Sequence, residues 1–583
     1  MIKYVCNNCD NLICETSTCP VCKERTSIEK SEIYFCDKCN IPLFDSVCSI
    51  CSSQCKYIGT DIRPVFPEER LLIECIEGKP FKYKDTSIWN TSGNNYFVNG
   101  KKISFSVKDV VENKNADKIR ELIVENKKQN LIYEENYFEE EYIKRFIYAN
   151  SVRYNSIVTE AHNYIKEKAK YFSLDEMFVS FSGGKDSTVT SDLVMSALGC
   201  QNVIHIYGDT TLEYPETGVY LSKFKKFFPK TPMLIAKNKD QNFNELCKVV
   251  GPPSRVMRWC CTIFKTGAIT RKIESTFKGK TRILSFQGLR RSESFSRSKY
   301  ERESEGAKIT KQKTIAPIID WQDFDIWLYI LTKNIPFNNA YRLGFSRVGC
   351  WCCPNNSNWS AFLSNVYMNE EYKKFNEILI DFAKQIGKPD PEEYIKSGGW
   401  KARQGGNGIN YSKNAIISFK PCVLEENTLN FELNKEINIM LYELFKPFGT
   451  LDFNIGNKRL GEVYVLDKQN NQPIIKLKGK IGQKILKVSI LKITPILKNQ
   501  KNAEMLIRYQ ITKFQTCLAC RACESVCKYN AISVKKCEQN ADETYTIEYK
   551  INEKRCVGCL ECVRHFDGGC YLKKVLKTKI NKE

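Results

Sequence analysis

Six residues rich in glycine and hydroxyl groups form the stretch of this chain best suited to hold an anion: Ser182, Gly183, Gly184, Lys185, Asp186 and Ser187. Adjacent glycines let a backbone approach a phosphate closely, and a helix N-terminus offers free N–H donors at the positive end of its dipole. Lys185 adds a positive charge, and the serines add hydroxyl donors. The spacing is neither the Walker A pattern nor the dinucleotide-binding glycine pattern. We predict a phosphate cradle of another kind; a glycine turn that only joins two elements is the alternative.

A buried strand and a helix are expected on either side of this loop. Residues 177–181 are almost uninterruptedly apolar, which is typical of a parallel strand, and Val189, Leu193 and Val194 follow at helical spacing. A second apolar stretch, 203–207, leads to Asp209. Because ligands of open α/β sheets bind at the carboxyl ends of strands, Asp209 is a candidate site residue. The predicted fold class is multidomain and mainly α/β, with a central parallel sheet.

The length and charge of the chain limit its class. A chain of 583 residues with 42% hydrophobic content should hold several domains. It has no uninterrupted apolar stretch long enough to cross a membrane and no N-terminal signal pattern, so we expect a cytoplasmic protein with no membrane partner. The formal charge of +22 favours nucleic acid as a partner, although a generally lysine-rich composition gives the same balance.

Most of the 28 cysteines occur in C-x-x-C pairs, the spacing of metal ligands in an intracellular chain. Two copies of one four-cysteine unit open the sequence, and each resembles a zinc ribbon over residues 1–30 and 31–60. Iron in place of zinc, or no metal, is the alternative, and Cys14 and Cys55 are spare. The expected ligands are Cys6, Cys9, Cys19 and Cys22 in the first copy and Cys36, Cys39, Cys48 and Cys51 in the second.

Two further cysteine strings near the C-terminus resemble a bacterial ferredoxin with two [4Fe–4S] clusters, over residues 511–583. In that fold the fourth cysteine of each string ligates the other cluster. The resemblance therefore implies one cluster on Cys517, Cys520, Cys523 and Cys570 and another on Cys556, Cys559, Cys562 and Cys527. The proline that usually follows the fourth cysteine is missing twice, and the last gap is long. A purely structural cluster pair is the alternative to electron transfer.

The middle of the chain resembles phosphoadenosine phosphosulfate (PAPS) reductases. The loop itself resembles the PP-loop of ATP pyrophosphatases, and further similar segments follow in the order of that family: 208–217, 258–265, 287–294 and 317–327. The resemblance implies a PP-loop catalytic domain over residues 131–405. We expect a small β-containing domain before it, over 61–130, with a hairpin turn at Asn99-Gly100, and an α+β connector after it, over 406–510. Within these flanks, 400–414 is predicted to be a mobile loop or linker, and Cys422 a core residue.

Three cations stand at positions that match the family: Lys265, Arg290 and Arg291. They follow predicted strands and could clamp phosphate or sulfate oxygens, which arginine does with two parallel hydrogen bonds. Surface charge is the alternative for each. Together with Lys185, Asp186 and Asp209, they form the predicted catalytic set.

A third cysteine group belongs to the same resemblance. Adjacent Cys260 and Cys261, followed by Cys350 and Cys353, are similar to the cluster ligands of adenylylsulfate reductases, which implies a third [4Fe–4S] cluster. Thiolates suit zinc equally well, so zinc is the alternative. Cys352 has no place in this scheme; it is a ligand in place of one of the others or a free thiol.

Two departures from the reductases bear on the reaction. The loop keeps Lys185, and no ECGLH-like cysteine tail follows the domain. Both favour ATP- and Mg²⁺-dependent adenylation of a substrate for sulfur transfer, such as nucleic-acid thiolation, with electrons from the chain's own ferredoxin and sulfur from a donor such as a cysteine desulfurase. A PAPS or adenylylsulfate reductase that needs no ATP is the first alternative. A non-catalytic nucleic-acid-binding or redox-sensing protein is the second.

Overall fold

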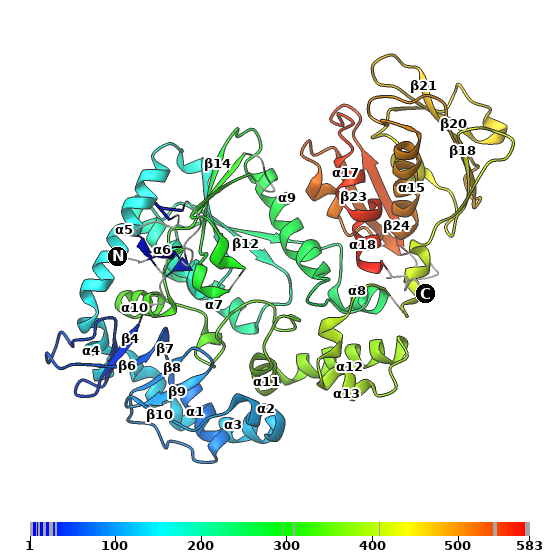
Figure 1. Ribbon diagram of the computed structural model, residues 1–583. Helices are drawn as coiled ribbons and strands as arrows, with labels where there is room; N and C mark the ends of the chain where they lie inside the picture. The colour runs from blue at the N-terminus through cyan, green and yellow to red at the C-terminus, as the bar shows by residue number, and fades with distance from the viewer. Residues whose placement is uncertain are drawn as a thin grey trace. The chain divides into compact units, whose positions relative to one another are not determined.

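The computed structural model describes residues 4–6, 9, 12–14, 19–22, 27–28, 32–294, 296–306, 309, 311–406, 408–539 and 545–577. The chain divides into two compact units (Figure 1). The first contains Met1–Tyr207, Thr211–Ile235 and Thr276–Tyr372, and the second contains Gly208–Thr210, Ala236–Ser275 and Lys373–Glu583. In the part of the chain that the structure describes, no helix is long and apolar enough to cross a membrane.

A six-stranded, mostly parallel sheet is the framework of the first unit, and it confirms the predicted α/β class. Its strand order is β13-β12-β11-β14-β16-β15. β11 is parallel to β12 and β14, β14 is parallel to β16, and β15 pairs antiparallel with β16. Continuous apolar runs suit strands that are covered on both faces. The strands are β11 (Met177–Phe181), β12 (Ile204–Asp209), β13 (Met233–Lys237), β14 (Ile283–Gln287), β15 (Glu303–Glu305) and β16 (Gln312–Ile315).

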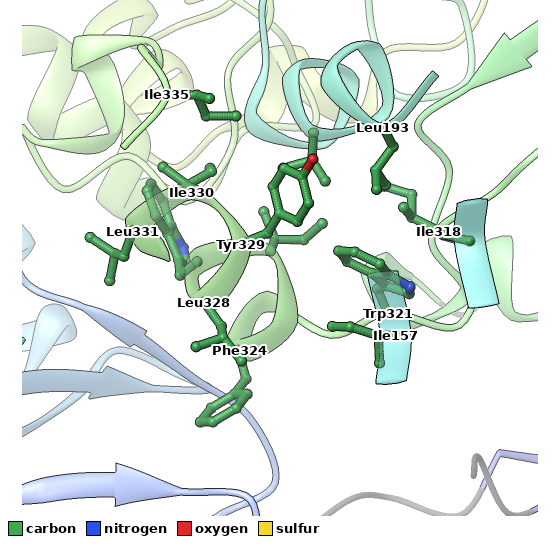
Figure 2. Packing of buried hydrophobic residues seen from close by; sticks show 14 of the residues in the cluster. Ile157, Leu193, Ile318, Trp321, Phe324, Leu328, Tyr329, Ile330, Leu331 and Ile335 are labelled. Carbon is green, nitrogen blue, oxygen red and sulfur yellow. The ribbon is translucent and has the colours of Figure 1, made fainter. Parts of the chain in front are cut away.

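Helix α10 (Asp323–Lys333) anchors the core of this unit. Its residues from Phe324 to Leu331 are all buried, because it packs against other elements on every side. It contacts α6 (Lys185–Leu198) and α5 (Ser151–Ala169). Figure 2 shows Leu193 of α6 and Ile157 of α5 among the side chains that surround α10.

The N-terminal part of the first unit contains three small antiparallel sheets. Two three-stranded sheets, β2-β1-β3 and β5-β4-β6, repeat the same order of strands, as the duplicated cysteine pattern suggests. The predicted hairpin is confirmed: β9 pairs with β10 through Asn99 and Gly100, both at positive φ. The strands are β1 (Tyr4–Cys6), β2 (Leu12–Cys14), β3 (Ser27–Ile28), β4 (Ile33–Cys36), β5 (Ile41–Leu43), β6 (Lys56–Gly59), β7 (Ile62–Pro64), β8 (Ile88–Thr91), β9 (Asn95–Val98) and β10 (Lys101–Lys102).

The remaining helices of the first unit follow from helical spacing of apolar residues. They are α1 (Pro67–Glu77), α2 (Val107–Asn113), α3 (Ala116–Asn136), α4 (Glu141–Ala149), α7 (Pro215–Phe227) and α11 (Asn358–Tyr367). Helix α12 (Asn369–Gln385) begins in this unit and continues into the second.

A six-stranded antiparallel sheet and a long helix, α15 (Gln500–Thr516), share the main core of the second unit. The sheet strands are β17 (Ser418–Pro421), β18 (Thr428–Glu432), β19 (Thr450–Asp452), β20 (Glu462–Leu466), β21 (Pro473–Lys478) and β22 (Ile485–Ile490). A separate hairpin joins β23 (Ile532–Gln539) to β24 (Tyr545–Ile551). The helices are α8 (Phe243–Val250), α9 (Gly267–Thr276), α13 (Pro391–Lys396), α14 (Ile439–Glu443), α16 (Ala522–Val526), α17 (Glu561–Arg564) and α18 (Tyr571–Leu576).

Two expectations for the second unit are wrong. Cys422 is not a core residue, since it is half-buried at the end of β17, beside the exposed Val423. The segment 400–414 is not a simple linker either. Trp400 and Arg403 are buried in it, and the Arg403 guanidinium donates to the carbonyl oxygens of Val250 and Pro252. A buried arginine with carbonyl partners fixes this segment against the turn after α8.

Candidate functional site

The predicted phosphate loop joins β11 to α6 in the first unit. Gly183 has φ of 73°, a left-handed conformation that favours glycine, and a Cβ there would lie 3.0 Å from Cγ2 of Thr217. Gly184 is the residue before the first turn of α6. The backbone N–H of Ser182 donates to Ser187 Oγ over 3.2 Å, and the two serine hydroxyl oxygens lie 3.1 Å apart. The strand, glycine turn and helix expected from the sequence are confirmed.

Two later segments of the chain, 338–341 and the residue after β14, hold this loop in place. The buried Asn338 donates from Nδ2 to the carbonyl oxygen of Gly183 at 3.2 Å and to Thr217 Oγ1 at 3.0 Å. The hydroxyl of Tyr341 accepts the Lys185 N–H at 3.0 Å. Gly288, just after β14, lies so close that a Cβ there would be 2.6 Å from the backbone C and O of Asp186. The loop backbone is therefore preorganised by its surroundings.

Two buried cations and two carboxylates form an ion network directly behind the loop. Lys185 Nζ lies 3.3 Å from Asp323 Oδ1 and 3.7 Å from Asp186 Oδ2. Arg290 Nε lies 2.5 Å from Asp186 Oδ1, and its Nη2 lies 2.6 Å from Asp323 Oδ1. The Lys185 and Arg290 side chains are only 4% and 3% exposed, so each depends on its carboxylate partners to offset desolvation. Although burial opposes the charge, Asp186 and Asp323 raise the pKa of Lys185.

A further carboxylate, Asp61, completes the network from far upstream in the sequence. Its two oxygens accept the backbone N–H groups of Asp323 at 3.1 Å and Phe324 at 3.0 Å, at the N-terminus of α10. Burial and the charge of Asp323 raise the pKa of Asp61 to about 7. Burial opposes ionisation of Asp323 as well, but Lys185 and Arg290 lower its pKa to about 2.

The other predicted catalytic residues lie in different settings. Arg291 is buried, paired with Asp320, and donates from Nε to the carbonyl oxygen of Tyr300 at 2.9 Å. Arg290 and Arg291 were expected to clamp phosphate, and the structure engages both with carboxylates. Asp209 and Lys265 belong to the second unit, where Asp209 Oδ2 lies 2.9 Å from Lys237 Nζ and Lys265 is exposed.

Sequence reasoning missed four residues of this site: Asp61, Asp323, Asn338 and Tyr341. Asp323 could have been found, because it stands between Asp320 and Asp325 in a segment that already resembled the family. Asp61 gave no signal, because nothing in its local sequence connects it with a loop more than a hundred residues later.

The N-terminal cysteines form groups that could hold metal ions. The sulfur atoms of Cys36, Cys39, Cys48 and Cys51 all lie within 4.8 Å of one another, which fits a single tetrahedral ion such as zinc. The Cys39 N–H also donates to Cys36 Sγ at 3.4 Å. In the first copy Cys9, Cys19 and Cys22 form an equivalent group. The side chains of Cys6 and Cys14 lie outside the described residues, and Cys55 is buried beside the second group.

The C-terminal cysteines lie near one another in the second unit. The thiols of Cys517, Cys523 and Cys570 all act electrostatically on Cys520, and those of Cys523, Cys527 and Cys556 act on Cys562, so Cys523 lies near both groups. One pocket is lined by all four cysteines assigned to the second cluster: Cys527, Cys556, Cys559 and Cys562. Four thiols around one pocket fit a [4Fe–4S] cluster, and Cys527 joins it across the strings.

A buried lysine near both C-terminal cysteine groups supports the fit of these cysteines to [4Fe–4S] clusters. Lys513 of α15 is 1% exposed and donates from Nζ to the carbonyl oxygen of Cys562 at 2.6 Å. Burial opposes its charge, yet neighbouring thiols, led by Cys523 and Cys562, raise its pKa. A buried ammonium is costly unless an anion offsets it, and a four-thiolate cluster carries net negative charge. The donor set and the lysine together suit anionic clusters.

The cysteines of the expected third cluster are divided between the units. Cys260 and Cys261 belong to the second unit, and Cys261 begins a π-helix, Cys261–Thr266, a rare conformation that is frequent at functional sites. Cys350 and Cys353 belong to the first unit, where Cys350 forms a β-bridge with Glu213. Cys352 is buried there. The thiols would suit a cluster or zinc.

Comparison with known proteins confirms the expected resemblance for the middle of the chain. Residues 176–356 match the phosphoadenosine phosphosulfate reductase domain family. An uncharacterized protein of Methanocaldococcus jannaschii is 32% identical over 227 residues, which are 39% of this chain and 45% of that protein. An adenosine 5'-phosphosulfate reductase of Neisseria meningitidis is 37% identical over 98 residues, or 16% of this chain and 36% of that enzyme. The chain thus spans less than half of each of these two relatives.

One solved structure with a similar chain trace is the phosphoadenylyl-sulfate reductase of Candida auris in complex with phosphate. It is 15% identical, covers 33% of this chain and 89% of its own, and has a TM-score of 0.27.

Proposed function

We propose that this protein is an iron–sulfur enzyme that binds ATP with Mg²⁺ at residues 182–187 and adenylates a substrate that then accepts sulfur. The observation that carries the proposal is the intact loop, in which Lys185 is kept and fixed at the first residue of α6. An enzyme that reduces a preformed sulfonucleotide releases no pyrophosphate, so it has no need of a lysine at this position. Adenylation does release pyrophosphate, whose charge must be neutralised.

The ion network gives this loop a fixed charge distribution. The backbone N–H groups at the start of α6 would receive phosphate oxygens, and Lys185 and Arg290 would supply positive charge behind them without having to reorganise. Asp186 and Asp323 hold both cations in place. Removing such a preorganised cation typically lowers the rate by about 10²–10³.

In this proposal, iron–sulfur clusters bound by the cysteine groups carry the electrons. Two [4Fe–4S] clusters would be held by the C-terminal strings, and a third in part by Cys260 and Cys261. Nucleic acid is the acceptor class that the net charge of +22 favours; five four-thiolate sites at about −2 each would reduce it to roughly +12, which is still basic. A separate sulfur donor, such as a cysteine desulfurase, would supply the sulfur.

The test is an assay with radiolabelled ATP that resolves AMP, ADP and pyrophosphate. The wild type should form AMP and pyrophosphate, and Lys185→Met should lose about 10²–10³ in rate. The single change leaves the buried Asp323 carboxylate with one cation fewer, which lowers stability. The double variant Lys185→Met/Asp323→Asn removes both charges. It should be as inactive as Lys185→Met but have a melting temperature closer to that of the wild type. Lys118→Met, at an exposed site on α3, is the control and should keep full activity.

A sulfonucleotide reductase is the second candidate function. The match of residues 176–356 and the adenosine 5'-phosphosulfate reductase relative favour it. Sulfite release from adenylylsulfate or PAPS, at full rate without ATP and in both the wild type and Lys185→Met, would establish this function and overturn adenylation.

A further inference from the structure

The first C-terminal cysteine string packs directly against the segment that carries Cys260 and Cys261, and both belong to the second unit. The Gln241 side chain donates from Nε2 to the carbonyl oxygens of Leu518 at 2.8 Å and Ala519 at 3.1 Å. These two carbonyls lie between Cys517 and Cys520 in the sequence, on the loop that would wrap one cluster. The contact is therefore made with the cluster-binding loop itself.

Alternating charges reinforce this contact. Arg521, the residue after Cys520, pairs through Nη1 with Asp240 Oδ2 at 2.7 Å and through Nε with Glu524 Oε2 at 2.9 Å. Arg271 of α9 approaches the same Glu524 at 3.7 Å. α9 also begins close to the string, because a Cβ on Gly267 would lie 3.0 Å from Ser525 Oγ. Pairs of partly buried opposite charges fix orientation as well as proximity.

Tyr571 lies between the two cysteine groups. It follows Cys570, the fourth cysteine assigned to the first string, and its hydroxyl shares a hydrogen bond with Thr262, the residue after Cys261. The thiols of Cys520, Cys260 and Cys261 all act electrostatically on this hydroxyl. Tyr571 is thus within electrostatic range of both the first string and the Cys260–Cys261 pair.

The four cysteines assigned to the second C-terminal cluster have a different environment. Cys559 is exposed and Val557 beside it is 56% exposed, whereas Cys517, Cys520, Cys523 and Cys570 are all buried. A low-potential electron carrier from outside could therefore approach the Cys559 group most easily. Solvent exposure and local charge also set cluster potentials, so the two groups should differ in potential.

We propose that the chain contains an ordered electron path that enters at the cluster of Cys527, Cys556, Cys559 and Cys562, passes to that of Cys517, Cys520, Cys523 and Cys570, and leaves to the centre at Cys260 and Cys261. Each step moves one electron: the external one-electron carrier is oxidised, and each cluster is reduced and then reoxidised by the next. Electron-tunnelling rates fall steeply with distance. The Asp240–Arg521 contact, which holds the first string against the Cys260–Cys261 segment, therefore sets the rate of the last step. The proposal rests on the cluster assignments of the proposed function, not on its ATP chemistry.

The test uses the full chain, purified without oxygen, mixed with reduced flavodoxin in the absence of ATP and substrate. Rapid-freeze EPR follows each cluster, and the Cys260 centre is identified by the signal that Cys260→Ser removes. Asp240→Arg should slow reduction of that centre at least tenfold and leave the other two clusters unaffected. The swap Asp240→Arg/Arg521→Asp should restore the rate, because aspartate tolerates the left-handed φ of 62° at this position.

Glu425→Gln is the matched control, because it breaks an ion pair with Lys487 elsewhere in the same unit and should change nothing. An unchanged rate in Asp240→Arg, or a Cys260→Ser variant that loses no signal, would overturn the path. Because neither ATP nor substrate is present, either failure is distinct from failure of the adenylation assay.

Discussion

Lys513 shows how a single buried charge could tune the clusters. It lies between the two cysteine groups at 1% exposure. Lys513→Met removes a positive charge that favours the reduced, more negative clusters, so we expect midpoint potentials to fall by about 50–100 mV. EPR-monitored redox titration measures this shift, with iron content checked in parallel. Lys501→Met, at an exposed site on the same helix, should leave the potentials unchanged. Equal potentials in Lys513→Met and the wild type would contradict this role.

Asp61 predicts a pH dependence of stability. Its pKa is raised to about 7, above the ordinary value near 4, so the folded state keeps a proton that the unfolded state has already released. The folded state therefore loses stability as pH rises from about 4 to about 7. Asp61→Asn cannot ionise, so its melting temperature relative to the wild type should increase over that interval and then level off. A difference that stays constant from pH 4 to 8 would show that Asp61 ionises normally.

At the scale of residues, the sequence predicted the loop but not its partners. Gly183, Lys185 and Asp186 were recognisable because their types and order are themselves the signal. The partners Asp323, Asn338 and Tyr341 are defined by tertiary contacts, and single aspartate, asparagine or tyrosine residues have no distinctive spacing. Arg290 was found by resemblance, yet its ion pairs with Asp186 and Asp323 emerged only from the fold.

At the scale of elements, adding one methyl group at Gly288 tests the close approach between the end of β14 and the start of α6. Gly288→Ala would place a Cβ 2.6 Å from the Asp186 carbonyl and 2.8 Å from the Ser187 nitrogen, and backbone atoms cannot move away cheaply. We expect a loss of about 1–3 kcal/mol and weaker ATP binding. Thermal unfolding and nucleotide titration measure the two effects.

The control for this change is Gly218→Ala. Gly218 lies in α7, and a Cβ there meets nothing within 4 Å, so alanine should stabilise the helix slightly. If both alanine variants had the same stability and the same affinity for ATP, contact with the loop would not be the cause of the effects of Gly288→Ala.

Elements with strong local signals were predictable, and elements defined by distant packing were not. β11, β12 and the hairpin at Asn99-Gly100 followed from apolar runs and from turn chemistry. The π-helix at Cys261 did not, because no residue pattern marks it. Cys422 was misjudged because cysteine is usually buried, and only the turn after β17 leaves it half-exposed.

At the scale of the whole molecule, metal content tests the cysteine assignments together. Two ribbons and three cubane clusters require about two zinc and about twelve iron per chain. Mass spectrometry of acid-digested protein, purified without oxygen, measures both. Iron near eight with a third zinc would mean that Cys260 and Cys261 hold zinc. Cys39→Ser should remove about one zinc and no iron.

The position of Asp61 makes the N-terminal segment part of the framework around α10. This residue precedes β7, close to the second ribbon, and its carboxylate receives the first N–H groups of α10, the helix that carries Asp323. The ribbon is tied to the same body, since Asn150 accepts the Phe44 N–H and donates to the Pro42 carbonyl. Replacing residues 1–61 with a segment that lacks this carboxylate would leave the first N–H groups of α10 without their acceptor. The N-terminal segment is therefore part of the framework that positions Asp323, and it is not an independent attachment.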